Sequence, residues 1–296
     1  MAVNIFDVAW AFGIVYDSYF VHALFLEKEL NAMNLTIIIS YYRALHHLKL
    51  VLKSLNQQSE NDFEVIVSED DYNAETIHFI LKNKNHYRFP IQHLYQKEDV
   101  GFRKNMMLNK SIVAARSKML AFIDGDCIPH QHFVKEYYKN AEESFILVGR
   151  RVKLGKEIST DILKNGSFEK MNFWRILFSD TKKKKEAIYY PYFHLSTTTR
   201  GLLGCNWGVQ KQHLLAINGF DEDYVSPGVG EDDDVEWRLK KNGLKVKSIK
   251  NKVIVYHLYH EKIYSKEEIM KNNQLFEQKK QANHIRCLNG IEKIVK

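Results

Sequence analysis

The chain has little cysteine and little proline. Its three cysteines, none of them in a C-x-x-C pair, argue against a disulfide framework and against a zinc site of cysteine spacing, so we expect a reducing compartment. Only four prolines break the chain, and neither an internal repeat nor a low-complexity linker is visible. The length of 296 residues therefore predicts one large domain or two closely associated ones.

Long apolar runs are also missing, even in the apolar first 34 residues. Residues 8–16 are nearly all apolar, but Asp7 and Asp17 bound them well short of the roughly 20 residues that a membrane helix needs. No Lys or Arg precedes Lys28, so the basic start of a secretory signal is absent. We expect residues 1–34 to form a helical N-terminal extension that packs on the body, with contact to a membrane surface as the alternative.

The charge balance is basic, with 43 Lys and Arg against 36 Asp and Glu. A nucleic-acid-binding protein is expected to show a basic stripe interleaved with aromatic residues. The only dense basic run here is the four lysines at 182–185. A solvated loop is the favoured interpretation of that run, and a phosphate or membrane contact is the alternative. We therefore predict no nucleic-acid partner.

From Leu35 onward, short β-branched runs alternate with segments of helical periodicity. Strands are predicted at 35–39, 63–67, 91–95 and 119–123, and helices at 45–55 and 104–115. This alternation predicts an α/β fold with a largely parallel sheet covered on both faces. Ligands of such sheets bind beyond the carboxyl ends of the strands, so the residues that follow each strand are the first candidates for a site.

One candidate site follows the strand at 119–123, which ends in Asp124-Gly125-Asp126. In an extended chain, residues i and i+2 project to one side about 6.5 Å apart, and the glycine lets the backbone turn. The two carboxylates repel each other, which favours a cation between them. Mg²⁺ or Mn²⁺ holding a diphosphate suits such oxygen ligands, whereas a turn or helix cap is the purely structural alternative.

A second candidate site is the acidic run Glu231-Asp232-Asp233-Asp234, which follows a glycine-containing segment and opens a helical pattern. The helix dipole and the unpaired backbone N–H groups explain one or two acids at a helix start. They do not explain four in succession. A carboxylate there would accept a proton from an attacking hydroxyl if a substrate lay over the helix start.

A third candidate is the strand predicted at 253–260, whose end carries His257 and His260. A neutral imidazole can complete an oxygen-rich octahedral metal site, and the sequence leaves open which histidine does so. Other polar residues follow the remaining strands or open a helix: Ser40, Tyr41 and Tyr42; Glu69, Asp70 and Asp71; and Gly101-Phe102-Arg103. A tyrosine ring, a carboxylate and an arginine suit the stacking, ring N–H and diphosphate of a uridine nucleotide.

The order of these motifs resembles that of family-2 glycosyltransferases with the GT-A fold. Residues 35–43, 63–70 and 121–126 resemble the first strand, the second strand and the D-x-D segment of that family. Residues 204–207, 218–221 and 230–234 are similar to the C-terminal half of β-1,4-galactosyltransferases and chondroitin-polymerase-like bacterial enzymes. The resemblance covers about 35–260 and implies a GT-A, Rossmann-like, mostly parallel sheet flanked by helices.

Carried over position by position, the resemblance implies three groups of site residues. Those implied for the uridine and diphosphate pocket are Ser40, Tyr42, Asp70, Arg103 and Asp124. Those implied as ligands of Mn²⁺ or Mg²⁺ are Asp124, Asp126 and His257. Those implied for catalysis and acceptor binding are Asp232 as general base, with Glu231, Asp233, Asn206 and Trp207 around the acceptor.

The implied reaction is an inverting, metal-dependent transfer of a hexose or N-acetylhexosamine from a UDP-sugar to a saccharide or lipid-linked glycan, in surface polysaccharide or glycan synthesis. A non-catalytic nucleotide- or glycan-binding module of the same fold is the alternative. A sugar nucleotidyltransferase would be expected to carry a glycine-rich phosphate loop after the first strand, and residues 40–44 contain no glycine.

The expected organisation has a nucleotide-sugar half at 35–130, an acceptor half at 131–260 and a helical segment at 261–296. Within that last segment, residues 266–287 predict an amphipathic helix that packs on the body, membrane attachment being the alternative. We expect a cytoplasmic protein, with peripheral contact at the inner membrane face as an option.

Overall fold

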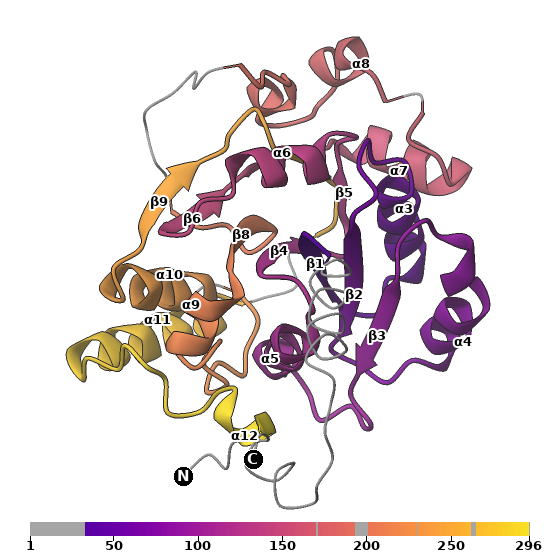
Figure 1. Ribbon diagram of the computed structural model, residues 1–296. Helices are drawn as coiled ribbons and strands as arrows, with labels where there is room; N and C mark the ends of the chain where they lie inside the picture. Colours follow the sequence, from indigo (N-terminus) through magenta and orange to yellow (C-terminus); the bar gives the residue numbers. More distant parts are fainter. Residues whose placement is uncertain (1–32, 170, 193–200, 229, 262–264, 296) are drawn as a thin grey trace, which may run out of the picture. The chain divides into compact units, whose positions relative to one another are not determined.

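The computed structural model describes residues 33–295, apart from 170, 193–200, 229 and 262–264 (Figure 1). The chain divides into two compact units, Met1–Met33 and Asn34–Lys296. Nearly all of the first unit, and with it the N-terminal extension predicted at 1–34, lies outside the described residues.

A seven-stranded sheet forms the centre of this unit, in the order β3-β2-β1-β4-β8-β6-β9. Its strands are β1 (Leu35–Tyr41), β2 (Phe63–Glu69), β3 (Ile91–Tyr95), β4 (Met119–Asp124), β6 (Phe145–Val148), β8 (Asn206–Gln210) and β9 (Lys245–Ser248). Strand β8 runs antiparallel to both its neighbours, and the other pairs are parallel. The expected α/β fold with a mostly parallel sheet is confirmed.

Helices cover both faces of the sheet because successive strand residues point to opposite sides. Ile37 and Ile39 of β1 belong to one core cluster, with α3 and α6, whereas Ile38 belongs to a second cluster, with α5, α9 and α10. The helices of the unit up to α10 are α3 (Leu45–Leu55), α4 (Ala74–Asn83), η1 (Lys84–His86), α5 (Lys104–Ala114), α6 (Phe133–Asn140), α7 (Lys156–Asn165), α8 (Phe173–Leu177), η2 (Lys184–Ala187), α9 (Lys211–Ala216) and α10 (Glu231–Lys241).

A smaller sheet of order β5-β10-β7 lies beside the large one. Its strands are β5 (Cys127–Pro129), β7 (Arg150–Lys153) and β10 (Ile254–His257). A third core cluster joins this sheet to α7 and α8. Strand β10 pairs antiparallel with β5, which sets His257 opposite Cys127, directly after the D-G-D segment.

The C-terminal segment is helical, as predicted. Helix α11 (Lys266–Gln281) begins where the sequence indicates but ends before residue 287, and the short α12 (Glu292–Val295) follows. It packs on the body mainly through polar contacts: Lys279 Nζ lies 2.6 Å from Asp221, and Asn272 donates to the Ser226 carbonyl. Among the described residues, no helix is long and apolar enough to cross a membrane.

Candidate active site

The ends of β1 and β4 are locked together at the D-G-D segment. Ser40 pairs in register with Asp124, and the Gly125 N–H donates to the Ser40 carbonyl at 2.7 Å. A Cβ at Gly125 would lie 2.9 Å from the Tyr41 ring, so glycine permits this close approach. The register therefore places Asp124 beside Ser40 at the carboxyl edge of the sheet.

Two histidines face Asp126. The Nε2 atoms of His257 and His260 lie 3.5 Å and 3.2 Å from Asp126 Oδ2. Burial opposes ionisation of Asp126, but the hydrogen bond from His260 and the charge of His257 outweigh it and lower the pKa of the carboxyl to about 2. Burial lowers the pKa of His257, whereas the hydrogen bond to Asp126 raises that of His260. The choice between the two histidines stays open, since both contact Asp126.

These side chains fit a divalent cation. Within the described residues, Asp126, Cys127 and His257 form a group whose ligand atoms lie within 4.8 Å of one another. Asp124 joins Cys127 and Cys205 in a second such group. Burial raises the pKa of the Cys127 thiol, which disfavours the thiolate. The carboxylates and the imidazole are therefore the donors of choice, and they suit Mn²⁺ or Mg²⁺.

The four acids at the start of α10 point in four directions because each helix residue turns by about 100°. Asp234 is 1% exposed and forms a buried ion pair with Arg238 at 2.7 Å, so it is structural. Asp233 is exposed to solvent. Glu231 is buried and faces Lys104 of α5. Asp232 is partly exposed, less than Asp233 and more than Glu231.

Asp232 shares a small pocket with the end of β1 and the start of α5. The lining residues are Ser40, Lys104, Leu108, Phe122, Ile123, Gly204, Trp207, Phe220 and Asp232. The Asp232 carboxylate accepts a hydrogen bond from the Gly204 N–H at 2.8 Å and interacts electrostatically with Asp124. Two acids more than a hundred residues apart in sequence thus lie within electrostatic range of each other.

Lys104 is a site residue that the sequence analysis missed. Its Nζ lies 3.5 Å from Glu231 Oε1, and the charges of Glu231, Asp124 and Asp232 outweigh burial and raise its pKa. Burial raises the pKa of Asp124 to about 6 and that of Glu231 to about 7, with Lys104 opposing both shifts. Lys104 directly follows Arg103 at the start of a helix that comes after a strand, and this position was the sequence signal for a site residue.

The predicted nucleotide-pocket residues follow neighbouring strands. Tyr42 is 51% exposed, so its ring is free of the core. Asp70 accepts hydrogen bonds from the Arg103 N–H and from Gln96, while burial raises its pKa to about 6. The preceding acid, Glu69, is fully buried against His93 at 2.7 Å, so Asp70 is the acid that faces α5. The Arg103 guanidinium donates to the Phe102 carbonyl.

Two side chains predicted to contact the acceptor, Trp207 and Asn206, are buried. The Trp207 side chain is 1% exposed and stacks on Phe122 with ring centroids 4.4 Å apart, because β8 pairs directly with β4. Asn206 is fully buried; it donates to the carbonyls of Arg150 and Val253 and accepts from the Tyr137 hydroxyl. Both side chains stabilise the core, and Trp207 also lines the pocket that holds Asp232.

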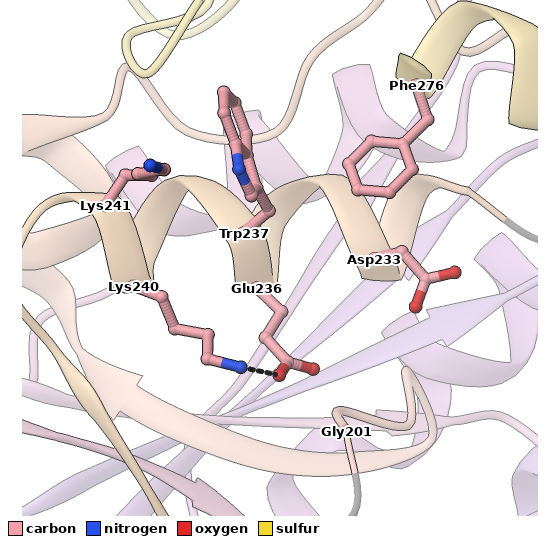
Figure 2. Close-up of a pocket in the computed structure, with 7 residues that line it drawn as sticks. All are labelled: Gly201, Asp233, Glu236, Trp237, Lys240, Lys241 and Phe276. Carbon is pink, nitrogen blue, oxygen red and sulfur yellow. Dashed lines mark hydrogen bonds and ion pairs between the residues drawn. The ribbon is translucent and has the colours of Figure 1, made fainter. Parts of the chain in front are cut away.

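A groove of about 390 Å³ lies beside the start of α10 (Figure 2). Asp233, Trp237 and Lys241 recur at i, i+4 and i+8, so they form one stripe along the helix. Phe276 of α11 meets Trp237 edge to face at 6.4 Å. The remaining lining residues are Gly201, Glu236 and Lys240. A half-buried aromatic ring flanked by charged groups suits a polar ligand that has apolar faces.

The sequence of this chain matches a known family over more than half its length. Residues 36–202 match the family described as glycosyl transferase family 2. The chain belongs to this family, and it is a glycosyltransferase. Residues 186–261 also match the family described as N-terminal domain of galactosyltransferase. The junction of the two matches falls just before β8, and the second one includes the acidic run.

A similar protein is the chondroitin synthase of Escherichia coli, to which this glycosyltransferase is 26% identical over 249 residues. The match covers 78% of this chain but only 35% of the relative, so the chain spans about a third of that protein's length. The similarity to this synthase agrees with the assignment of the chain as a glycosyltransferase.

Solved structures establish the fold as GT-A. S. aureus TarS superposes with a TM-score of 0.57 at 14% identity, covering 83% of this chain and 39% of TarS. Residues 1–349 of TarS, solved in complex with UDP-GlcNAc, give 0.53 at 15% identity, covering 82% and 65%. The mannosyltransferase PcManGT from Pyrobaculum calidifontis, in complex with GDP-Man and Mn²⁺, gives 0.52 at 16% identity, covering 78% and 58%.

Proposed function

We propose that this glycosyltransferase moves a hexose or N-acetylhexosamine from a UDP-sugar to a saccharide hydroxyl, with inversion at the anomeric carbon, in polysaccharide or glycan synthesis. The observation that carries the proposal is that Asp124 and Asp232 both interact electrostatically with Lys104, while Asp126, two residues after Asp124, lies 3.5 Å from His257. A donor diphosphate and an attacking hydroxyl need such groups at one place.

The donor is assigned to the carboxyl edge of β1, β2 and β4. The exposed Tyr42 ring offers a stacking surface for the base, and Asp70 lies at the start of α5. Ser40 and Asp124 are adjacent across the β1–β4 pair. The complexes of TarS with UDP-GlcNAc and of PcManGT with GDP-Man support a nucleotide-sugar donor for this fold.

A divalent cation is assigned to Asp124, Asp126 and His257. A bound Mn²⁺ or Mg²⁺ would offset the negative charge that develops on the departing diphosphate. The chain itself supplies Lys104 close to the same carboxylates, and Arg151 of β7 interacts electrostatically with Asp124. These cations keep the acidic cluster from repelling an incoming diphosphate.

Asp232 is assigned as the general base. Of the four acids of the run it combines partial exposure with a place in the pocket shared with Ser40 and Lys104. Its carboxylate takes the proton of the acceptor hydroxyl as the hydroxyl oxygen bonds to the anomeric carbon. The bond from that carbon to the diphosphate oxygen breaks, and the electron pair leaves with UDP. A single displacement of this kind inverts the configuration.

The acceptor is assigned to the groove of Figure 2. Asp233 lines that groove and directly follows the proposed base, so the groove begins one residue from Asp232 along α10. The Trp237 ring offers a face on which a sugar can stack, with charged groups at both ends of the stripe. This assignment replaces the buried Trp207 with a residue that faces solvent.

Replacement of Asp232 by Asn tests the proposal, because it retains the shape and removes the base. We expect kcat for transfer to fall by about 10²-fold or more, while UDP binding is retained. Asp180→Asn, which changes an exposed acid elsewhere, is the control. Wild-type turnover in Asp232→Asn would refute the base assignment.

Two further measurements separate the parts of the proposal. Chelation should abolish transfer, and added Mn²⁺ should restore it; full activity in EDTA would refute the metal assignment. A screen of UDP-sugars should find one whose UDP release depends on both an acceptor and Asp232. UDP binding without such release would favour the non-catalytic alternative for this chain.

A further inference from the structure

Helix α8 presents large apolar side chains to solvent. Those of Phe173, Trp174, Leu177 and Phe178 are 42%, 65%, 36% and 82% exposed. The Trp174 and Phe178 rings stack with centroids 6.3 Å apart, and Phe173 meets Trp174 edge to face at 5.7 Å. Single exposed apolar residues are common on protein surfaces, whereas a contiguous cluster of them marks an interaction surface.

The body of the protein holds this cluster in place. Ile176 is the buried residue of α8 and joins the third core cluster. Asn172 caps the helix by accepting from the Arg175 N–H at 2.9 Å, and the Arg175 guanidinium pairs with Asp161 of α7 at 2.7 Å. The aromatic side is therefore displayed by an anchored helix.

A basic run borders the apolar cluster. Lys184 Nζ donates to the Leu177 carbonyl at 2.8 Å, which ties the lysines at 182–185 to the end of α8. The backbone of Lys182 pairs with that of Lys153 on β7, and the side chains of Lys182, Lys183 and Lys185 are exposed. Residues 171–185 contain five basic side chains and one acid, Asp180.

We propose that α8 and the lysines at 182–185 form a surface that binds an anionic lipid bilayer. Trp and Phe rings favour the boundary between headgroups and acyl chains, and lysines are attracted to anionic headgroups. Protein interfaces are depleted in lysine, so the basic border favours a bilayer over a protein partner.

The position of this surface is compatible with catalysis. In Figure 1, α8 lies at the top, well apart from α10 and α11, which form the groove of Figure 2. A bilayer in contact with α8 thus leaves the groove open. The proposal does not rest on the proposed reaction, because vesicle binding is measured without donor or acceptor.

Flotation of the full chain with vesicles tests the proposal. We expect binding to vesicles that contain phosphatidylglycerol, little binding to phosphatidylcholine alone, and release by high salt. The double variant Trp174→Ser, Phe178→Ser should lose most of the binding. Its control, Met270→Ser with Leu288→Ser, removes two other exposed apolar side chains and should bind as the wild type does.

Charge is tested separately. The triple variant Lys182→Glu, Lys183→Glu, Lys185→Glu should bind at least tens of times more weakly, since each lysine near an anionic surface contributes about fivefold to partitioning. Lys82→Glu, Lys84→Glu, Lys245→Glu changes net charge equally at other exposed sites and should retain most of the binding. Lys184 is left intact because it contacts α8.

Brominated lipids locate the contact. They should quench tryptophan fluorescence in the wild type and in Trp237→Phe but much less in Trp174→Phe. Absence of binding to anionic vesicles would overturn the proposal, and so would undiminished binding by both patch variants. A self-association abolished by Trp174→Ser, Phe178→Ser, without vesicle binding, would also overturn it in favour of a protein interface.

Discussion

The Asp232 carboxylate and the Gly204 backbone are in direct contact: Asp232 Oδ2 accepts the Gly204 N–H at 2.8 Å. Gly204 lies just before β8, and Asp232 lies in the first turn of α10. A Cβ added at Gly204 would lie 2.6 Å from both carboxylate oxygens. The glycine therefore sets where this carboxylate points.

Gly204→Ala should displace the Asp232 carboxylate. Because misplacing a catalytic group by about 1 Å can cost 10²-fold in rate, we expect kcat to fall by about tenfold or more. Steady-state kinetics measure this, with circular dichroism to verify folding. The control is Asp180→Asn, which changes an exposed acid away from both pockets. A wild-type kcat in Gly204→Ala would contradict the expectation.

Lys104→Met should leave Glu231 buried without a cation. Since removing one partner of a buried ion pair costs about 3 kcal/mol or more, urea denaturation should show a loss of stability of that order. The double variant Lys104→Met, Glu231→Gln should recover part of it, because the lone buried charge is also gone. If the two substitutions are simply additive, Lys104 and Glu231 are not coupled.

Trp207→Leu should destabilise the fold without weakening acceptor binding. The ring is buried and stacked on Phe122, and loss of a buried Trp costs about 3 kcal/mol. Trp237→Ala should do the opposite, raising the acceptor KM severalfold with little change in unfolding free energy. Thermal unfolding and acceptor titration together distinguish the two tryptophans. A raised acceptor KM in well-folded Trp207→Leu would return that residue to the acceptor site.

Acid should destabilise the protein partly through His130. Burial lowers its pKa to about 4 from an unfolded value of 6.5, so below pH 6.5 the unfolded state binds the proton more readily. The stability due to neutral His130 is complete above pH 6.5 and is lost as pH falls through 4, by about 3 kcal/mol in all.

His130→Asn should flatten that dependence between pH 6.5 and 4. Its amide oxygen can replace Nδ1 as acceptor of the His132 N–H. Chemical denaturation across this range gives the slope, and His78→Asn, at an exposed site, serves as control. An unchanged slope in His130→Asn would show that His130 does not contribute.

Local patterns predicted the first half of the fold well. The runs at 91–95 and 45–55 correspond to β3 and α3 residue for residue, and the apolar residues of α3 recur at helical spacing. Strands β5 to β9 were not predicted. They are three to five residues long and partly antiparallel, so their pairing depends on distant partners rather than on their own pattern.

The candidate site was predictable as a set of segments, and the resemblance also named Asp232 within the acidic run. Asp124, Asp126 and the acidic run were recognisable because clustered carboxylates repel each other. A strand end or a helix start does not by itself offset that repulsion. Lys104 was overlooked since its role depends on α5 facing α10, and the burial of Trp207 was not foreseen because it follows from the pairing of β8 with β4.

By itself, the sequence determined the alternation of strands and helices, the sheet edge where polar residues gather and the family to which the chain belongs. Hydrophobic periodicity and short motifs encode these locally. Only the tertiary structure decided that Lys104 lies near these acids, which tryptophan faces solvent, and that α8 displays its rings beside a lysine run. Burial and contact between residues far apart in the chain are properties of packing, and no local pattern specifies them.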